Sequence, residues 1–187
     1  MPSRNPERTV VELTDPRALR ALAHPTRLKL VGLLRREGPL TATQLGDRIG
    51  ESPSSCSFHL RQLAKWGLVE DAGGGKGRNR PWRATAELTS WKVDTGEQAT
   101  AAGMFGTAIA QQYAELMLDW FRQMSDEPPA WRLAHHIGDR HLHLSPDELR
   151  ELGQKVDALI ASYDRDPRPD DRRVAFLYAG FPLPAPR

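Results

Sequence analysis

The sequence predicts a mainly α fold with one small β-hairpin. Several segments repeat apolar residues at helical spacing, and proline or glycine residues separate most of them. A glycine-rich run, residues 73–77, lies between two short strand-like segments and predicts the hairpin. With 187 residues, the chain is long enough to bury a hydrophobic core.

Three short helices are expected in the first fifty residues. The first begins with a capping aspartate and a proline, Asp15-Pro16, and Pro25 ends it. The second ends at Gly38-Pro39, and the third is capped by Thr41 or Thr43. Three helices joined by tight turns, followed by a longer amphipathic helix, predict a helix-turn-helix core.

The fourth helix is expected over residues 53–66 and holds the only cysteine, Cys56. At 100° per residue, Cys56 lies in the middle of an apolar stripe with Leu60 and Leu63, and His59 lies at its border. A reactive thiolate needs exposure and an electropositive environment, and this stripe denies it exposure. We therefore interpret Cys56 as a small core hydrophobe and not as a nucleophile.

The opposite side of this helix carries groups that suit the major groove of DNA. Arg61 can pair with guanine and Gln62 with adenine, and hydroxyls near the helix start can hold phosphate. Phe58 is the exception on this side. Contact with a thymine methyl group and packing against a neighbouring helix both explain it. A merely solvated polar face is the alternative for the whole side.

The predicted hairpin is basic. Its tip and second strand carry Lys76, Arg78, Arg80 and Arg83. Arginine side chains there suit contact with phosphates or insertion into a narrow minor groove. Arg83 can instead pair with Glu70 across the hairpin.

Positive charge is concentrated in the first half of the chain. Residues 1–90 contain 15 Lys and Arg against 9 Asp and Glu, a balance of +6. Residues 91–123 contain 2 against 4, and residues 124–187 contain 9 against 11, so each balance is −2. This asymmetry is typical of a first half that meets a polyanion.

The stretches ALAHPTRLKLVGLL and ATQLGDRIGESPSSCSFHLRQLAKWGLVE, with the basic hairpin, together resemble the ArsR-type winged-helix transcriptional repressors. The resemblance covers residues 14–86 and implies that the helix of residues 53–66 enters the major groove. The DNA-facing or flanking positions that it implies are Ser54, Ser55, Ser57, Phe58, His59, Arg61 and Gln62. We add Lys65, and Thr43 and Gln44 of the preceding helix, to the predicted DNA-binding set.

A long helix over residues 95–124 is expected to form a dimer interface. Its apolar stripe consists of Phe105, Ile109, Tyr113, Leu116 and Trp120. A winged helix typically reads one half-site, which favours dimerisation; packing within the same chain is the alternative. Ser145 and Glu148 predict the capping box of a further helix, and residues 172–184 predict a terminal strand.

The chain is thus expected to consist of three parts. They are a flexible arm over residues 1–8, a winged helix-turn-helix domain over residues 9–90 and a helical dimerisation region over residues 91–187. Aromatic residues of that last region line an effector pocket or form ordinary core; they are Phe105, Tyr113, Trp120, Phe121 and Trp131.

The sequence offers little support for a metal site. Many repressors of this type hold metals through cysteines before the recognition helix or through histidine and carboxylate pairs on the C-terminal dimer helix, and this sequence departs from both patterns. The remaining candidates are His135, His136, His141 and His143, with Asp139 between them. Their spacing does not make a site, so no metal or cofactor is predicted.

The sequence therefore predicts a homodimeric repressor that binds a roughly palindromic operator in double-stranded DNA. A metal or small-molecule sensor on the same fold is the first alternative. A hydrolytic enzyme that uses Cys56 or the C-terminal histidines is a remote one, because the chain lacks a nucleophile elbow and a phosphate-binding glycine loop. With one cysteine, no signal peptide and no membrane-spanning apolar run, a cytoplasmic protein without membrane contact is expected.

Overall fold

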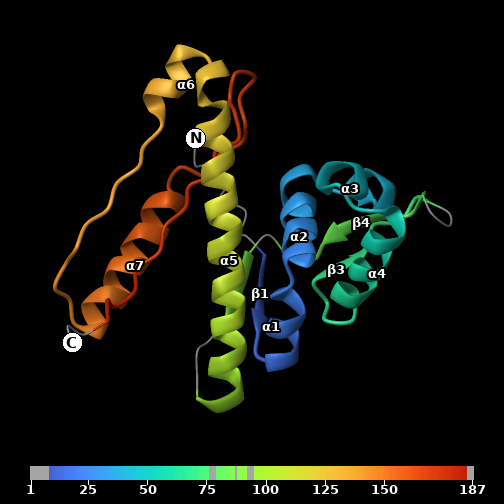
Figure 1. The fold of residues 1–187 in the computed structure, drawn as a ribbon, viewed down its shortest axis with the longest axis horizontal. Helices are drawn as coiled ribbons and strands as arrows, with labels where there is room; N and C mark the ends of the chain where they lie inside the picture. The colour runs from blue at the N-terminus through green and yellow to red at the C-terminus, as the bar shows by residue number, and fades with distance from the viewer. Residues whose placement is uncertain (1–8, 76–78, 87, 92–94, 185–187) are drawn as a thin grey trace. The chain divides into compact units, whose positions relative to one another are not determined.

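The computed structural model describes residues 9–75, 79–86, 88–91 and 95–184. It contains two compact units, one within residues 8–125 and one within residues 126–187 (Figure 1). The predicted arm over residues 1–8 lies outside the described residues.

The first unit is mainly helical and contains two small sheets. Its elements in chain order are β1 (Val10–Leu13), α1 (Pro16–Leu22), α2 (Pro25–Glu37), β2 (Leu40–Thr41), α3 (Ala42–Ile49), α4 (Pro53–Ala64), β3 (Val69–Asp71), β4 (Pro81–Ala84), β5 (Leu88–Trp91) and α5 (Gly96–Gln123). The predicted fold class, helical with a small β-hairpin, is therefore confirmed.

Side-chain caps fix where the first helices begin. The Asp15 carboxylate accepts a hydrogen bond from the Arg17 backbone N–H at 2.8 Å, as predicted for α1. Thr41 caps α3 in a capping box with Gln44, which decides between the two threonines. Helix α4 begins after Ser52 and ends at Ala64, slightly earlier than expected.

The predicted hairpin is present in a three-stranded sheet with the order β2-β4-β3. Strands β3 and β4 are antiparallel, with Glu70 opposite Arg83. The sequence did not predict β2, because two residues carry no periodic pattern. It also missed a parallel pair, in which β1 runs beside β5 with Val10 opposite Leu88.

One core joins the helices of the first unit. The largest side chains with less than 2% exposure include Leu19, Leu30, Leu45, Leu60, Leu63 and Phe105. The first half of α5 packs on α1 and α2, which is why this unit continues through Ser125 and does not end near residue 90.

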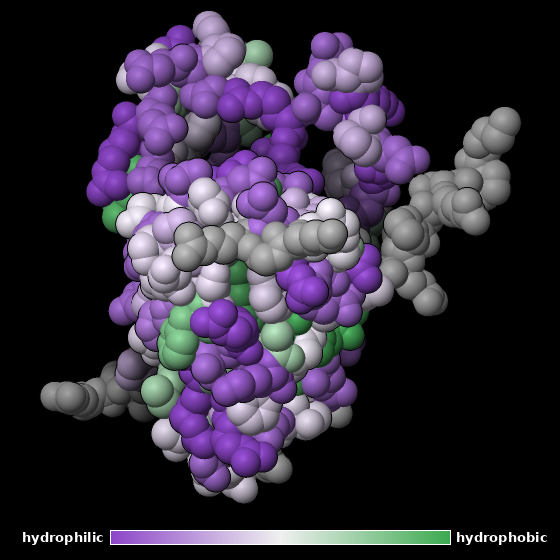
Figure 2. All heavy atoms as spheres, turned by 90° about the vertical axis from the view of Figure 1, so that its right-hand side faces the viewer, coloured by the Kyte–Doolittle hydropathy of each residue, from purple (hydrophilic) through white to green (hydrophobic). Residues whose placement is uncertain are grey.

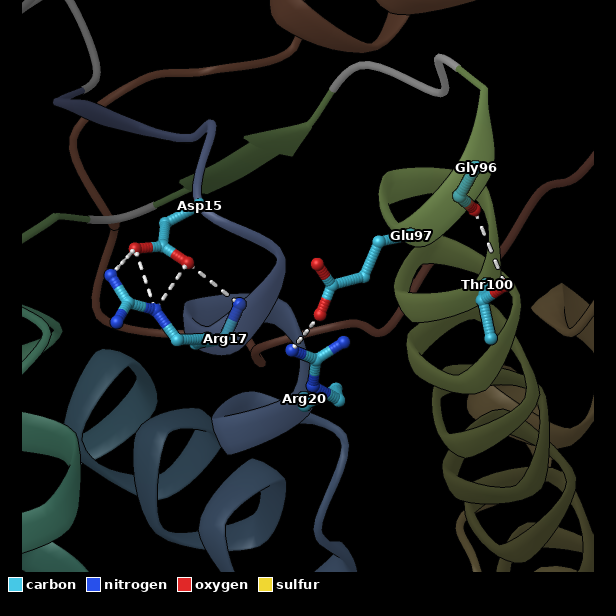
Figure 3. A network of polar contacts seen from close by, with 6 residues as sticks. All are labelled: Asp15, Arg17, Arg20, Gly96, Glu97 and Thr100. Atoms are coloured by element: carbon cyan, nitrogen blue, oxygen red, sulfur yellow. Dashed lines mark hydrogen bonds and ion pairs between the residues drawn. The ribbon is translucent and has the colours of Figure 1, made fainter.

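A polar clamp accompanies this packing of α5 on α1. The Arg20 guanidinium donates to the Glu97 carboxylate at 2.6 Å, and Thr100 donates to the Gly96 carbonyl one turn further along α5 (Figure 3). The clamp is solvent-exposed, so we attribute the stability of the contact to the buried side chains beneath it.

A short 3₁₀ turn (Met124–Asp126) follows α5 at the boundary between the units, and the second unit contains α6 (Pro129–Ala134) and α7 (Pro146–Ala161). The capping box of Ser145 and Glu148 on α7 is confirmed. Arg172 pairs with Glu127 and lies over the Trp131 ring at 5.1 Å. None of the described residues 126–184 is buried.

The predicted terminal strand is wrong. Residues 172–184 have no regular secondary structure, because a strand needs a hydrogen-bonded neighbour and the described part of this unit contains no other strand. Among the described residues, no helix is both long and apolar enough to span a bilayer.

Candidate nucleic-acid interface

Helix α4 has one buried side and one outward side, as the sequence predicts. Cys56, Leu60 and Leu63 are completely buried. Burial, together with the negative charge of Glu51, raises the pKa of the Cys56 thiol. The interpretation of Cys56 as a core residue is therefore confirmed, since the thiol is neither exposed nor activated.

The outward side of α4 presents polar and cationic groups to solvent. Ser54, Phe58, Arg61 and Lys65 are exposed, whereas Ser55, Ser57, His59 and Gln62 are half-buried. On the side of the molecule that carries α3 and α4, hydrophilic residues surround smaller apolar patches (Figure 2). Hydrogen-bonding groups on an exposed helix are what readout of base edges in a major groove requires.

A close turn sets the position of α4 relative to α3. A Cβ atom on Gly46 would lie 2.5 Å from the backbone oxygen of Glu51, so only glycine fits at this position inside α3. Of the two residues predicted to contact DNA from α3, Thr43 is exposed. Gln44 is also exposed, but its side-chain oxygen accepts the Thr41 N–H at 2.9 Å and serves the helix cap.

Aromatic rings connect the outward side of α4 to the start of α2. The Phe58 and His59 ring centroids are 5.3 Å apart in an edge arrangement, and His59 lies 4.7 Å from His24. His24 is the N-cap residue of α2. No sequence pattern indicates this role for His24, although His24 lies in the AHPTRL stretch that supports the family resemblance.

The two histidines lie in an environment that disfavours their protonation. The Nδ1 atoms of His24 and His59, and Nε of Arg27, are buried without a hydrogen-bond partner in the described part of the chain. Burial lowers the pKa of both histidines, and the charge of Arg27 lowers it further, whereas Glu51 acts in the opposite direction. Both rings are therefore neutral at neutral pH.

The described arginines of the wing are paired with acidic residues of β3. Arg83 Nε lies 2.7 Å from the Glu70 carboxylate, so the alternative that the sequence left open for Arg83 is present. Arg80 lies 3.2 Å from the Asp71 carboxylate. All four side chains are at the surface, where such pairs are weak and exchange readily for phosphate contacts. The predicted contacts Lys76 and Arg78 lie outside the described residues.

A family model described as a helix-turn-helix domain matches residues 22–72. This range runs from the last residue of α1 to just beyond β3 and includes both α3 and α4. The chain contains a helix-turn-helix domain. No curated protein is significantly similar to this sequence.

Several solved structures are partly similar to this chain. The transcriptional repressor BigR from Xylella fastidiosa is 25% identical, with 51% of this chain and 83% of that chain covered and a TM-score of 0.32. A possible transcriptional regulator for arsenical resistance is 28% identical, with coverages of 59% and 96% and a TM-score of 0.33. A MarR family regulator from Neisseria meningitidis is 18% identical, with 73% of each chain covered and a TM-score of 0.33. Because these TM-scores are below 0.5, the overlaps add nothing to the family match.

The stripe predicted for dimerisation is divided between two environments. Phe105 is only 2% exposed and packs edge-on against Trp91 at 4.7 Å, so it belongs to the core of its own chain. Its assignment to a dimer surface is corrected accordingly. Ile109, Leu116 and Trp120 are half-buried, and Tyr113 is exposed.

The ligand sites considered from the sequence receive little support. His135, His136, His141 and His143 are exposed, and no group of three or more metal-ligating side chains occurs among the described residues. A groove of about 350 Å³ lies between α2 and α5 and is bordered by the Lys29–Glu115 ion pair at 2.8 Å. None of the five aromatic residues predicted to line an effector pocket borders this groove.

Proposed function

We propose that the protein is a DNA-binding transcriptional regulator, an ArsR-type repressor that binds a roughly palindromic operator as a homodimer. Helix α4 enters the major groove, and the wing formed by β3 and β4 contacts the adjacent backbone. The observation that carries this proposal is the division of α4 into a completely buried side and an exposed side bearing Ser54, Arg61 and Lys65. Repression of this kind is binding without catalysis and needs no metal or cofactor.

The second half of α5 supports dimerisation. Tyr113, Met117 and Phe121 follow one another at four-residue spacing and are 37%, 43% and 44% exposed. Apolar side chains in one exposed row are typical of a helix that packs against another helix. A two-fold interface places this row of one protomer against the same row of its partner.

The first experiment is selection of duplexes from a random DNA library by the purified full-length protein at near-physiological salt. Enrichment of an inverted repeat supports a dimer that reads sequence. Binding without enrichment, which weakens steadily as salt rises, contradicts sequence-specific repression and indicates non-specific contact with phosphates.

Two variants separate base readout from general charge. Arg61→Ala is expected to weaken binding by about 1–3 kcal/mol and to relax preference at one position in each half-site. Arg150→Ala removes another exposed positive charge, on α7, and serves as the matched control. If Arg61→Ala weakens binding equally to all DNA sequences, Arg61 does not read a base.

The dimer is tested by light scattering after size-exclusion chromatography. Met117→Glu places a charge in the exposed apolar row and is expected to yield monomers. Gln111→Glu introduces the same charge at an exposed position on another side of α5 and is expected to leave the dimer intact. Equal dimer content in both variants refutes this interface.

Effector binding is a second candidate function, supported by the groove between α2 and α5. A ligand there would contact the recognition domain through α2 and the dimer helix through α5. A thermal-shift screen of small molecules tests it, since selective binding to the folded state raises the melting temperature.

A further inference from the structure

Phe58 is unusual among the outward-facing residues of α4. Its phenyl ring is 52% exposed, and its neighbours on this side are the exposed polar residues Ser54, Arg61 and Lys65. Exposure of an aromatic ring to water forgoes the stabilisation that burial provides. Among the described residues, the aromatic contact of Phe58 is with His59 of its own helix, and about half of the Phe58 surface, 52%, stays open to solvent.

The phenyl ring is supported by His59, which in turn contacts His24. The edge contact with His59 and the further contact of His59 with His24 form a continuous row of rings from α4 to the N-cap of α2. Each pair lies within the distance range of favourable aromatic interactions. A supported ring loses little conformational entropy when it meets a partner, so it is pre-organised for contact.

The chemistry of a phenyl ring restricts what it can recognise in a major groove. It has no hydrogen-bond donor or acceptor, and the edges of guanine, adenine and cytosine present donors and acceptors there. Thymine is the one standard base that presents an apolar group in this groove, its C5-methyl. We infer that Phe58 recognises the C5-methyl group of a thymine in each operator half-site. The inference rests on the proposed function of α4 as the recognition helix.

The test uses the full-length protein and the duplex enriched by selection. Each thymine of one half-site is replaced in turn by deoxyuridine, which lacks the methyl group and keeps the same hydrogen-bonding groups. At one position, the replacement of thymine by deoxyuridine is expected to weaken binding roughly fourfold, which is the effect of burying one apolar carbon group. At that position, 5-methylcytosine paired with guanine is expected to bind more tightly than unmodified cytosine.

Variants connect the methyl effect to the ring. Phe58→Ala is expected to bind the thymine and uracil duplexes equally, whereas Phe58→Leu retains part of the difference. Arg61→Ala, the matched control on the same face, retains the full difference at this position while losing preference elsewhere. Because Phe58 is exposed, the variants are expected to keep the circular dichroism spectrum and melting temperature of the wild type.

The outcomes distinguish the inference from the function on which it rests. An enriched operator without any uracil-sensitive position, or a uracil effect that persists in Phe58→Ala, overturns the inference and leaves sequence-specific binding in place. A ring that wedges between base steps also fails this test, because its effect does not depend on one methyl group. Failure to enrich any sequence overturns both.

Discussion

Replacement of Cys56 by serine tests the architecture of α4 most directly. The substitution keeps the shape of the side chain and exchanges a thiol, which behaves as a small hydrophobe, for a hydroxyl that needs a hydrogen-bond partner. Cys56 is completely buried between Leu60 and the core beneath α4. The serine hydroxyl is therefore expected to lower the free energy of unfolding, because its burial removes its hydrogen bonds to water.

The magnitude follows from the local hydrogen bonds. A buried hydroxyl without a partner costs about 1–3 kcal/mol. The backbone oxygen one turn earlier, on Ser52, already accepts the Cys56 N–H at 3.0 Å and can offer its second lone pair to the new hydroxyl, which reduces the cost. We expect a loss of about 2 kcal/mol, which lowers the melting temperature by roughly 6–10 °C for a unit of this size.

Thermal unfolding followed by circular dichroism measures this loss, with two comparison variants. Cys56→Ala leaves a small cavity without a polar atom and is expected to cost about 1 kcal/mol. Ala110→Ser adds a hydroxyl at an exposed position of α5 and is expected to cost less than about 0.5 kcal/mol. A serine variant as stable as the wild type, together with rapid labelling of the native thiol by a disulfide reagent, refutes the core assignment and favours a redox role.

Three further outcomes follow from the described contacts. Because the pKa values of His24 and His59 are lowered in the folded state, the unfolded state binds more protons. The two histidines therefore contribute their full stabilisation above about pH 6.5, and the free energy of unfolding decreases as the pH falls below that value. His59→Gln is expected to make this decrease smaller, as measured by thermal unfolding at several pH values. Phe105→Ala is expected to destabilise the protein by about 3–5 kcal/mol. Because Phe105 lies in its own chain's core, this loss should not vary with protein concentration. Arg80→Ala is expected to weaken binding to all duplexes and to lower the salt slope by about 0.9 in titrations at several salt concentrations; an unchanged slope removes Arg80 from the phosphate contacts.

The elements that the sequence predicted correctly are those with local signals. Asp15 and Ser145 each cap a helix within the same few residues that form it, so the pattern and the structure coincide. The parallel pair of β1 and β5 depends instead on segments separated by most of the domain. No local pattern reports such a pairing, and a two-residue strand such as β2 has no pattern at all.

The candidate interface was predictable in its faces but not in its contacts. Periodicity correctly placed Cys56 inside and Arg61 outside, because both follow from rotation about one helix axis. The support of His59 by His24 joins two helices and is visible only in three dimensions. Likewise, periodicity placed Phe105 and Tyr113 in one apolar stripe. It does not reveal that Phe105 is buried by other side chains of the same chain, whereas Tyr113 is exposed.

The division of α5 has a consequence for the operator. Its first half is anchored in the recognition unit by Phe105 and by the Arg20–Glu97 clamp, and its second half carries the proposed dimer row. One continuous helix of 28 residues, about 42 Å long, therefore joins the interface to the DNA-binding core without an intervening loop. A rigid connection fixes the separation and rotation of the two α4 helices. Insertion of one base pair between the half-sites turns one by roughly 35° relative to the other. We expect this insertion to abolish tight binding in a titration, and equal affinity for both spacings would show that the two recognition units move independently.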